Sequence, residues 1–147
     1  MPVLKVVKTH PKAVLPAKAS SGAAAFDLAA ALDAPVVIEP GKTVVVSTGI
    51  AVELPFEDAV ALVFSRSGLS VSSGISLINS VGVIDSDYRG TIRLGLINHS
   101  DTPFQVECGD RLAQLMVVGI ISPSVVEVEE LGTTERGEGG FGSTGIR

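Results

Sequence analysis

Short runs rich in β-branched residues, closed by Gly or Pro, recur along this sequence and limit what it can fold into. Most span only a few residues, as strands bounded by turns do, whereas helices need longer amphipathic stretches. Sixteen Gly and eight Pro in 147 residues provide the turns. The runs cover residues 3–7, 36–39, 43–54, 59–64, 91–98, 111–121 and 125–128. The pattern predicts an all-β fold.

Alternation within residues 91–98 indicates how such strands pack. Ile92, Leu94 and Leu96 would face a core, while the residues between them would face away. Few residues are aromatic and none is Trp, so Val, Ile, Leu and Ala must fill that core. We therefore predict a jelly-roll-like barrel or sandwich of antiparallel strands. At most one short helix is expected, at residues 69–73 between Gly68 and Gly74.

The composition changes near the C-terminus. From residue 132 onward the chain consists mainly of Gly, Ser, Thr, Glu and Arg, with Phe141 as the only aromatic residue. Such a stretch has too little apolar surface to fold alone. We predict a single β-rich domain over residues 1–131 and a flexible Gly-rich arm over residues 132–147.

Charge and composition exclude several classes of function. A net charge of −5 argues against a general nucleic-acid binder. The single cysteine, Cys108, excludes an intrachain disulfide framework and a CxxC metal site. The longest apolar runs fall short of the roughly 20 residues that cross a bilayer. The first ten residues carry no apolar signal core, so we expect a cytoplasmic protein without membrane contacts.

No P-loop motif occurs, but residues 65–68 could bind an anion. Arg66 supplies a guanidinium fork and Ser67 a hydroxyl, and Gly68, which has no side chain, lets the anion approach the backbone closely. An ordinary turn with an exposed Arg explains four residues equally simply.

Residues 79–90 combine an amide, carboxylates and a phenol with apolar residues in a predicted hairpin. Asp85, beside Ile84, could be a partly buried general base. A hairpin whose acidic residues face solvent is the alternative.

Two later segments are also ambiguous. Gln114 interrupts an apolar strand within residues 109–115, and a buried amide needs partners, which can be purely structural. In residues 136–145, loose glycines, Arg136 and Phe141 could hold phosphates and stack on a ring, or form a disordered tail.

Together with residues 25–28, these four segments resemble, in order, the five motifs of the trimeric dUTPase family. The resemblance runs from about residue 20 to the C-terminus. It implies a homotrimer of jelly-roll-like subunits with active sites at the subunit interfaces. It also implies that water attacks the α-phosphorus of dUTP, yielding dUMP and pyrophosphate. That reaction lowers dUTP and supplies dUMP for thymidylate synthesis.

The resemblance implies a role for each matched residue. Asp85 would be the general base and receive the sugar 3′-hydroxyl, and the Tyr88 ring would pack on the deoxyribose and reject ribonucleotides. Uracil would be read by Asn79, Gly82, Val83 and Ile84. The phosphates would be bound by Arg66, Ser67, Gly68 and Gln114. The arm would act as a lid through Arg136, Phe141, Gly142, Ser143 and Thr144. Mg²⁺ would be bound by the triphosphate and by waters that Asp27 holds.

Two alternatives share this fold. A dCTP deaminase-like enzyme would need a differently placed glutamate as base, and a non-catalytic nucleotide-binding trimer would not need Asp85. The chain also departs from the family pattern at two positions. Phe26 stands where Tyr is usual, and Ser65 replaces a Pro, which we expect to loosen the anion-binding turn.

Overall fold

The computed structural model describes residues 2–140 and consists of short strands with one short helix. The elements in chain order are β1 (Lys5–Lys8), β2 (Phe26–Ala29), β3 (Val36–Ile38), β4 (Thr43–Ser47), β5 (Ile50–Glu53), β6 (Ala59–Ser65), α1 (Ser67–Ser73), β7 (Ile75–Leu77), β8 (Val81–Ile84), β9 (Arg93–Asn98), β10 (Phe104–Val106) and β11 (Arg111–Gly119).

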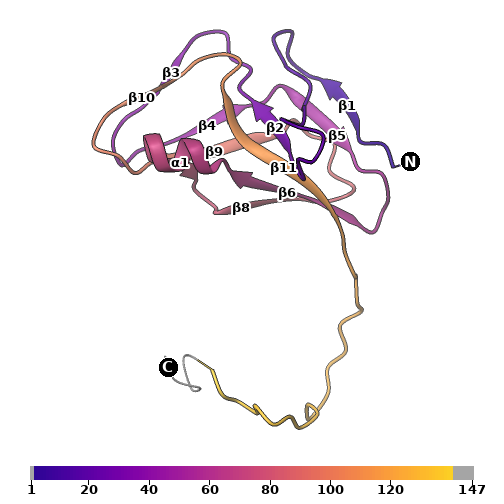
Figure 1. Ribbon diagram of the computed structural model, residues 1–147. Coiled ribbons are helices and arrows are strands. Elements are labelled where there is room, and N and C mark those ends of the chain that lie inside the picture. Colours follow the sequence, from indigo (N-terminus) through magenta and orange to yellow (C-terminus); the bar gives the residue numbers. More distant parts are fainter. Residues whose placement is uncertain (1, 141–147) are drawn as a thin grey trace.

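Two antiparallel sheets face each other across the core (Figure 1). The larger has the strand order β2-β11-β6-β8 and the smaller the order β4-β9-β7. Val63 and Leu115 from the larger sheet, and Leu94 and Leu96 from the smaller, belong to one buried cluster. Two further strand pairs, β1-β5 and β10-β3, extend the structure. The all-β, jelly-roll-like prediction with a single short helix is confirmed.

Strand β9 follows the predicted alternation. Ile92, Leu94 and Leu96 are each at most 3% exposed, and Arg93 between them is exposed. The predicted helix extends over α1 and ends at Gly74, whose φ of 68° is left-handed. Residues 43–54, predicted as one run, form two strands instead. Gly49 breaks them with φ +64°, at a point where an added Cβ would lie 2.7 Å from the Cβ atoms of His10 and Ala31.

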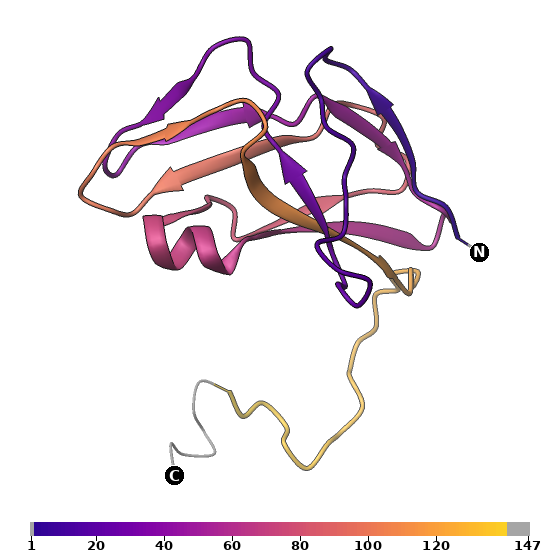
Figure 2. The same cartoon turned by 45° about the horizontal axis from the view of Figure 1, so that its top comes forward.

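The predicted strand at residues 125–128 is wrong. The last strand ends at Gly119, and residues 120–140 contain no strand or helix. Figures 1 and 2 show this segment leading away from the sheets. Val125 and Val126 are 98% and 73% exposed. Strong local β propensity does not make a strand without a partner for its backbone hydrogen bonds. Within residues 2–140 no helix is long and apolar enough to cross a membrane.

Candidate active site

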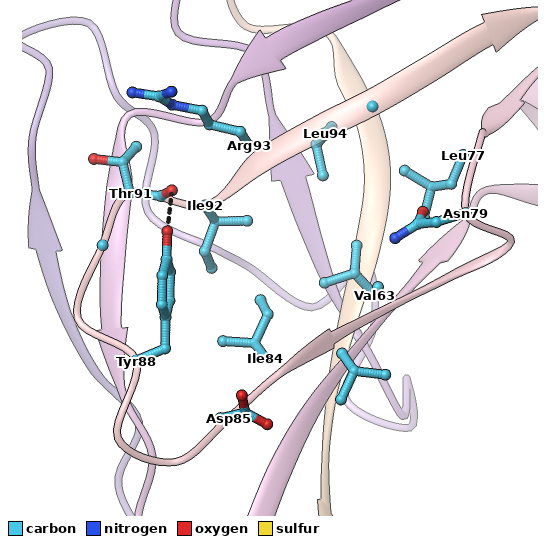
Figure 3. A pocket seen from close by; sticks show the side chains of 14 residues that line it. Val63, Leu77, Asn79, Ile84, Asp85, Tyr88, Thr91, Ile92, Arg93 and Leu94 are labelled. Atoms are coloured by element: carbon cyan, nitrogen blue, oxygen red, sulfur yellow. Dashed lines mark hydrogen bonds between the residues drawn. The ribbon is translucent and has the colours of Figure 1, made fainter.

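A pocket of about 510 Å³ opens between β8 and β9 (Figure 3). Its inner wall is apolar, with Val63, Leu77, Ile84, Ile92 and Leu94. Polar groups lie around this wall, and they come from Asn79, Asp85, Tyr88, Thr91 and Arg93. Gly82, Val83, Gly90 and Gly95 also line it. Apolar walls with a few placed polar groups, at this volume, are typical of small-molecule sites.

Asp85 and Tyr88 belong to a tight turn after β8. The Tyr88 backbone N–H donates to the Asp85 carbonyl oxygen at 3.1 Å, and the Tyr88 hydroxyl donates to the Thr91 carbonyl oxygen at 3.2 Å. The turn places both side chains at the rim of the pocket (Figure 3). Of the two alternatives for Asp85, partly buried or facing solvent, the single chain shows the second, because Asp85 is exposed. It follows the last residue of an edge strand, and no segment within residues 2–140 covers it.

A second cluster brings Asp27 between two arginines. Arg66 Nε lies 3.1 Å from Asp27 Oδ1, and Arg111 Nη1 lies 3.0 Å from Oδ2. Arg66 also donates to the Arg111 carbonyl oxygen at 2.9 Å. Two guanidinium groups share one carboxylate, so the cluster carries a net positive charge beside the predicted anion-binding turn. Charge-assisted contacts of this kind are strong and directional.

Gln114 and Ser65 hold that turn against the sheet. Gln114 Nε2 donates to the Ser65 carbonyl oxygen at 3.0 Å, which gives the strand amide the partner it needs. Ser65 Oγ accepts from the Leu77 backbone N–H at 2.8 Å. The expectation that Ser65 loosens the turn is wrong, because its hydroxyl forms a tie to β7 that Pro could not make. Ser67 and Gly68 follow directly, and both are exposed.

The apolar wall of the pocket and the Asp27 cluster lie on opposite faces of the larger sheet. Gln114 pairs with both Asp27 and Phe64, whereas Leu115 pairs with Val63, which also pairs with Gly82. Paired residues share a face and neighbouring residues alternate. The face of Val63 and Gly82 is the pocket side. The other face carries Asp27 and Gln114.

The clusters also lie at opposite ends of β6. Arg66 directly follows that strand, whereas Asp85 follows Ile84, which pairs with Ala61 near its start. From position 60 to position 66 the strand advances about 20 Å, at roughly 3.3 Å per residue. Asp85 and the phosphate-side candidate Arg66 are therefore separated along this strand within one chain.

The arm is described only in part. Arg136 is exposed, and its Nε donates to the Gly139 carbonyl oxygen at 2.8 Å. Four predicted lid residues lie outside the described residues, namely Phe141, Gly142, Ser143 and Thr144. Between residues 2 and 140 there is no group of three or more His, Cys, Asp or Glu side chains that could hold a metal ion.

Comparison with known proteins identifies the family. The dUTPase family profile matches residues 11–145. The chain belongs to the dUTPase family. It is 45% identical over 142 residues to a deoxyuridine 5′-triphosphate nucleotidohydrolase from Paraburkholderia phymatum, covering 97% of this chain and 96% of the relative. It is 48% identical over 144 residues to the deoxyuridine 5′-triphosphate nucleotidohydrolase of a Hydrogenobaculum species. That alignment covers 98% of this chain and 99% of the relative.

Solved dUTPase structures agree with the fold. A variant of the Staphylococcus bacteriophage 80alpha dUTPase, solved with dUpNHpp, superposes with a TM-score of 0.90 at 29% identity, covering 99% of this chain and 100% of that one. A variant dUTPase from phage phi11 of S. aureus, described with a structural Mg(II) ion, superposes with a TM-score of 0.81 at 27% identity. The superposition covers 89% of this chain and 99% of that one.

Arg111 is the residue that the sequence analysis left without a role. It lies in the dUTPase segment around Gln114, and an arginine at the start of an apolar strand was the only signal available. Its contact with Asp27 depends on the β2–β11 pairing, which joins positions 84 residues apart.

Proposed function

We propose that this dUTPase family member hydrolyses dUTP to dUMP and pyrophosphate, with water attacking the α-phosphorus. The observation that carries the proposal is the pocket that combines Asn79, Asp85 and Tyr88 around an apolar wall. Two findings support a nucleotide as the substrate. The chain belongs to the dUTPase family, and the similar phage 80alpha dUTPase was solved with the dUTP analogue dUpNHpp. The predicted cytoplasmic location stays a prediction.

The pocket suits a nucleoside. Asn79 and the backbone of Gly82, Val83 and Ile84 would hydrogen-bond the uracil edge. An added Cβ at Gly82 would lie 3.2 Å from Val63 Cβ, so a side chain at position 82 would crowd the apolar wall of the pocket. The Tyr88 ring at the rim would pack on deoxyribose and exclude a 2′-hydroxyl, because a buried hydroxyl without a partner is costly.

Asp85 would orient the attacking water and accept its proton. A general base works within roughly 2.6–3.2 Å of the proton it takes, or through one water. Of the residues that line the described pocket, Asp85 is the carboxylate. No glutamate of the described chain lines it, which weighs against the deaminase alternative. A non-catalytic binder would not need a general base at this position.

We propose that one substrate contacts several copies of the chain. Arg66 and Gln114 would bind phosphates that Asp85 must also approach. Within one chain Asp85 and Arg66 lie about 20 Å apart along β6. A second copy that presents its Asp27 face to the pocket of the first would remove this separation.

The face that carries Asp27 and Gln114 has the character of an interface. Leu62, Phe64 and Met116 are only half-buried, and the paired Val81 and Val83 are 38% and 64% exposed. Contiguous exposed apolar surface marks association sites. When one surface of each copy binds a different surface of the next copy, the copies can close into a ring. A homotrimer, which the family resemblance implies, would contain three such sites.

Mg²⁺ fits this arrangement as part of the substrate complex. An ionised carboxylate offers about four acceptor positions, and Asp27 uses two for the arginines. The remaining two can accept from metal-bound water. When bound, Mg²⁺ would offset triphosphate charge and fix its conformation. Arg66, Ser67, Gly68 and Gln114 would hold the phosphates around it.

The arm would complete the site as a lid. Residues 120–140 leave the body, and Ile121 and Leu131 are 93% and 86% exposed in the single chain. A segment of this length can reach another copy, since extended chain advances roughly 3.3–3.6 Å per residue. Arg136 and residues 141–144 would then bind the outer phosphates and cover the base, excluding bulk water.

A substrate panel tests the proposal. The protein is incubated with Mg²⁺ and dUTP, dCTP, dTTP or UTP, and pyrophosphate and ammonia are measured. We expect pyrophosphate from dUTP alone and no ammonia. Ammonia released from dCTP would establish the deaminase, and binding without turnover would establish the non-catalytic trimer.

A further inference from the structure

The Tyr88 ring lies against Gly90, in the space that a side chain at position 90 would occupy. A Cβ added at Gly90 would lie 2.3 Å from the Tyr88 hydroxyl oxygen, 2.5 Å from Cζ and 3.0 Å from Cε2. Cβ contacts below 3.0 Å essentially do not occur. Because three atoms of one rigid ring are involved, rotating the hydroxyl cannot relieve the overlap. Any side chain at position 90 must displace the ring as a whole.

The backbone on the N-terminal side of Gly90 is held in place. Tyr88 N–H donates to Asp85 O at 3.1 Å, and Arg89 Nη1 donates to Ser86 O at 2.8 Å and to Tyr88 O at 3.0 Å. These three bonds oppose a backbone shift. The single bond between the Tyr88 hydroxyl and Thr91 O, at 3.2 Å and exposed, opposes ring rotation much less. The ring would therefore yield before the turn.

We propose that Gly90 is a specificity-determining positioning residue, which keeps Tyr88 at the rim of the pocket by having no side chain. The inference rests on the proposed function, in which Tyr88 distinguishes deoxyribose from ribose. Gly90 does not have the positive φ that favours glycine, so alanine is compatible with its backbone. The effect of a methyl group at this position is thus an effect on the ring.

Kinetics of Gly90→Ala test the proposal. We expect the ratio of kcat/KM for dUTP to that for UTP to fall by about tenfold or more, towards the value of Tyr88→Ala. The double variant should show no further loss, because without the ring nothing is left to displace. Gly22→Ala is the matched control, since nothing lies within 4 Å of its added Cβ and its φ is not positive. An unchanged ratio in Gly90→Ala, or additive losses in the double variant, would overturn the proposal.

Tyrosine fluorescence provides a readout that does not depend on turnover. Tyr88 is the only Tyr and the chain has no Trp, so the emission reports this ring alone. Gly90→Ala should change its quenching by acrylamide, and Gly22→Ala should not. Unchanged quenching contradicts ring displacement.

If quenching changes while Tyr88→Ala keeps its selectivity, the proposed role of Tyr88 fails and the positioning by Gly90 stands. If Gly90→Ala lowers Tm, Tyr88→Ala should restore it, and failure to do so also contradicts the proposal.

Discussion

The Asp27 carboxylate and the Arg66 guanidinium form an ion pair at 3.1 Å, although Asp27 lies in β2 and Arg66 directly follows β6, and these strands are not neighbours. The side chains of Asp27 and Arg66 are 16% and 29% exposed, so solvent screens the pair only in part. Asp27 thereby fixes the direction in which Arg66 points. In the proposed phosphate site it would act through an arginine as well as through Mg²⁺.

Asp27→Asn should raise KM for dUTP by roughly tenfold or more, as expected when charge-assisted contacts are lost. The Mg²⁺ concentration for half-maximal rate should rise with it. Asp33→Asn is a matched control, because Asp33 also contacts two basic side chains but is 85% exposed. Steady-state rates over a Mg²⁺ titration measure both quantities. An unchanged KM would remove Asp27 from the phosphate site.

Replacing Asp85 by Asn should lower kcat by about 10³-fold or more, because the amide cannot accept the proton of the water. Binding of a non-hydrolysable dUTP analogue, measured by calorimetry, should stay within a few fold. Asp87→Asn, an exposed neighbour in the same turn that does not line the pocket, should keep its rate. A near-normal rate in Asp85→Asn would exclude Asp85 as the base.

Mixing two inactive variants tests whether the site is shared between copies. Arg66→Ala and Asp85→Asn should each be nearly inactive alone. After unfolding and refolding together in equal amounts, about one site in four should contain both native residues if they come from different chains. The mixture should then regain about a quarter of native activity. A mixture as inactive as its components would indicate that both residues act within one chain.

Truncation before Gly132 should leave the fold intact and severely reduce turnover. The removed residues that the structure describes, 132–140, lie beyond the last strand and make no core contacts. Circular dichroism and Tm should therefore match the full chain while kcat falls. Full activity in the truncated protein would contradict the lid.

Short-range sequence patterns correctly predicted those features of the fold that depend only on residues close together in the chain. Alternation placed Ile92, Leu94 and Leu96 in the core, and Gly74 ended the helix. Gly49 was missed as a break because a lone glycine also occurs inside strands, and only the crowding by Ala31 reveals the need for it.

The features that the sequence did not predict depend on pairing between strands far apart in the chain and on contacts with other copies of the chain. The motif order grouped Asp27, Arg66 and Gln114 at one phosphate site, yet it could not tell that Asp27 and Gln114 lie on the sheet face opposite the apolar wall of the pocket. That separation depends on strand register. The exposure of Asp85 and the missing strand at residues 125–128 have a related cause, since neither segment finds a covering partner among the residues that the structure describes.

Hydrolysis of dUTP with Mg²⁺ in ¹⁸O-labelled water tests the proposed reaction most directly. Mass spectrometry of the products identifies the bond that breaks and the phosphorus that water attacks. Attack on the α-phosphorus predicts dUMP that carries one ¹⁸O atom, together with unlabelled pyrophosphate. Label in pyrophosphate, or the absence of dUMP, would contradict it.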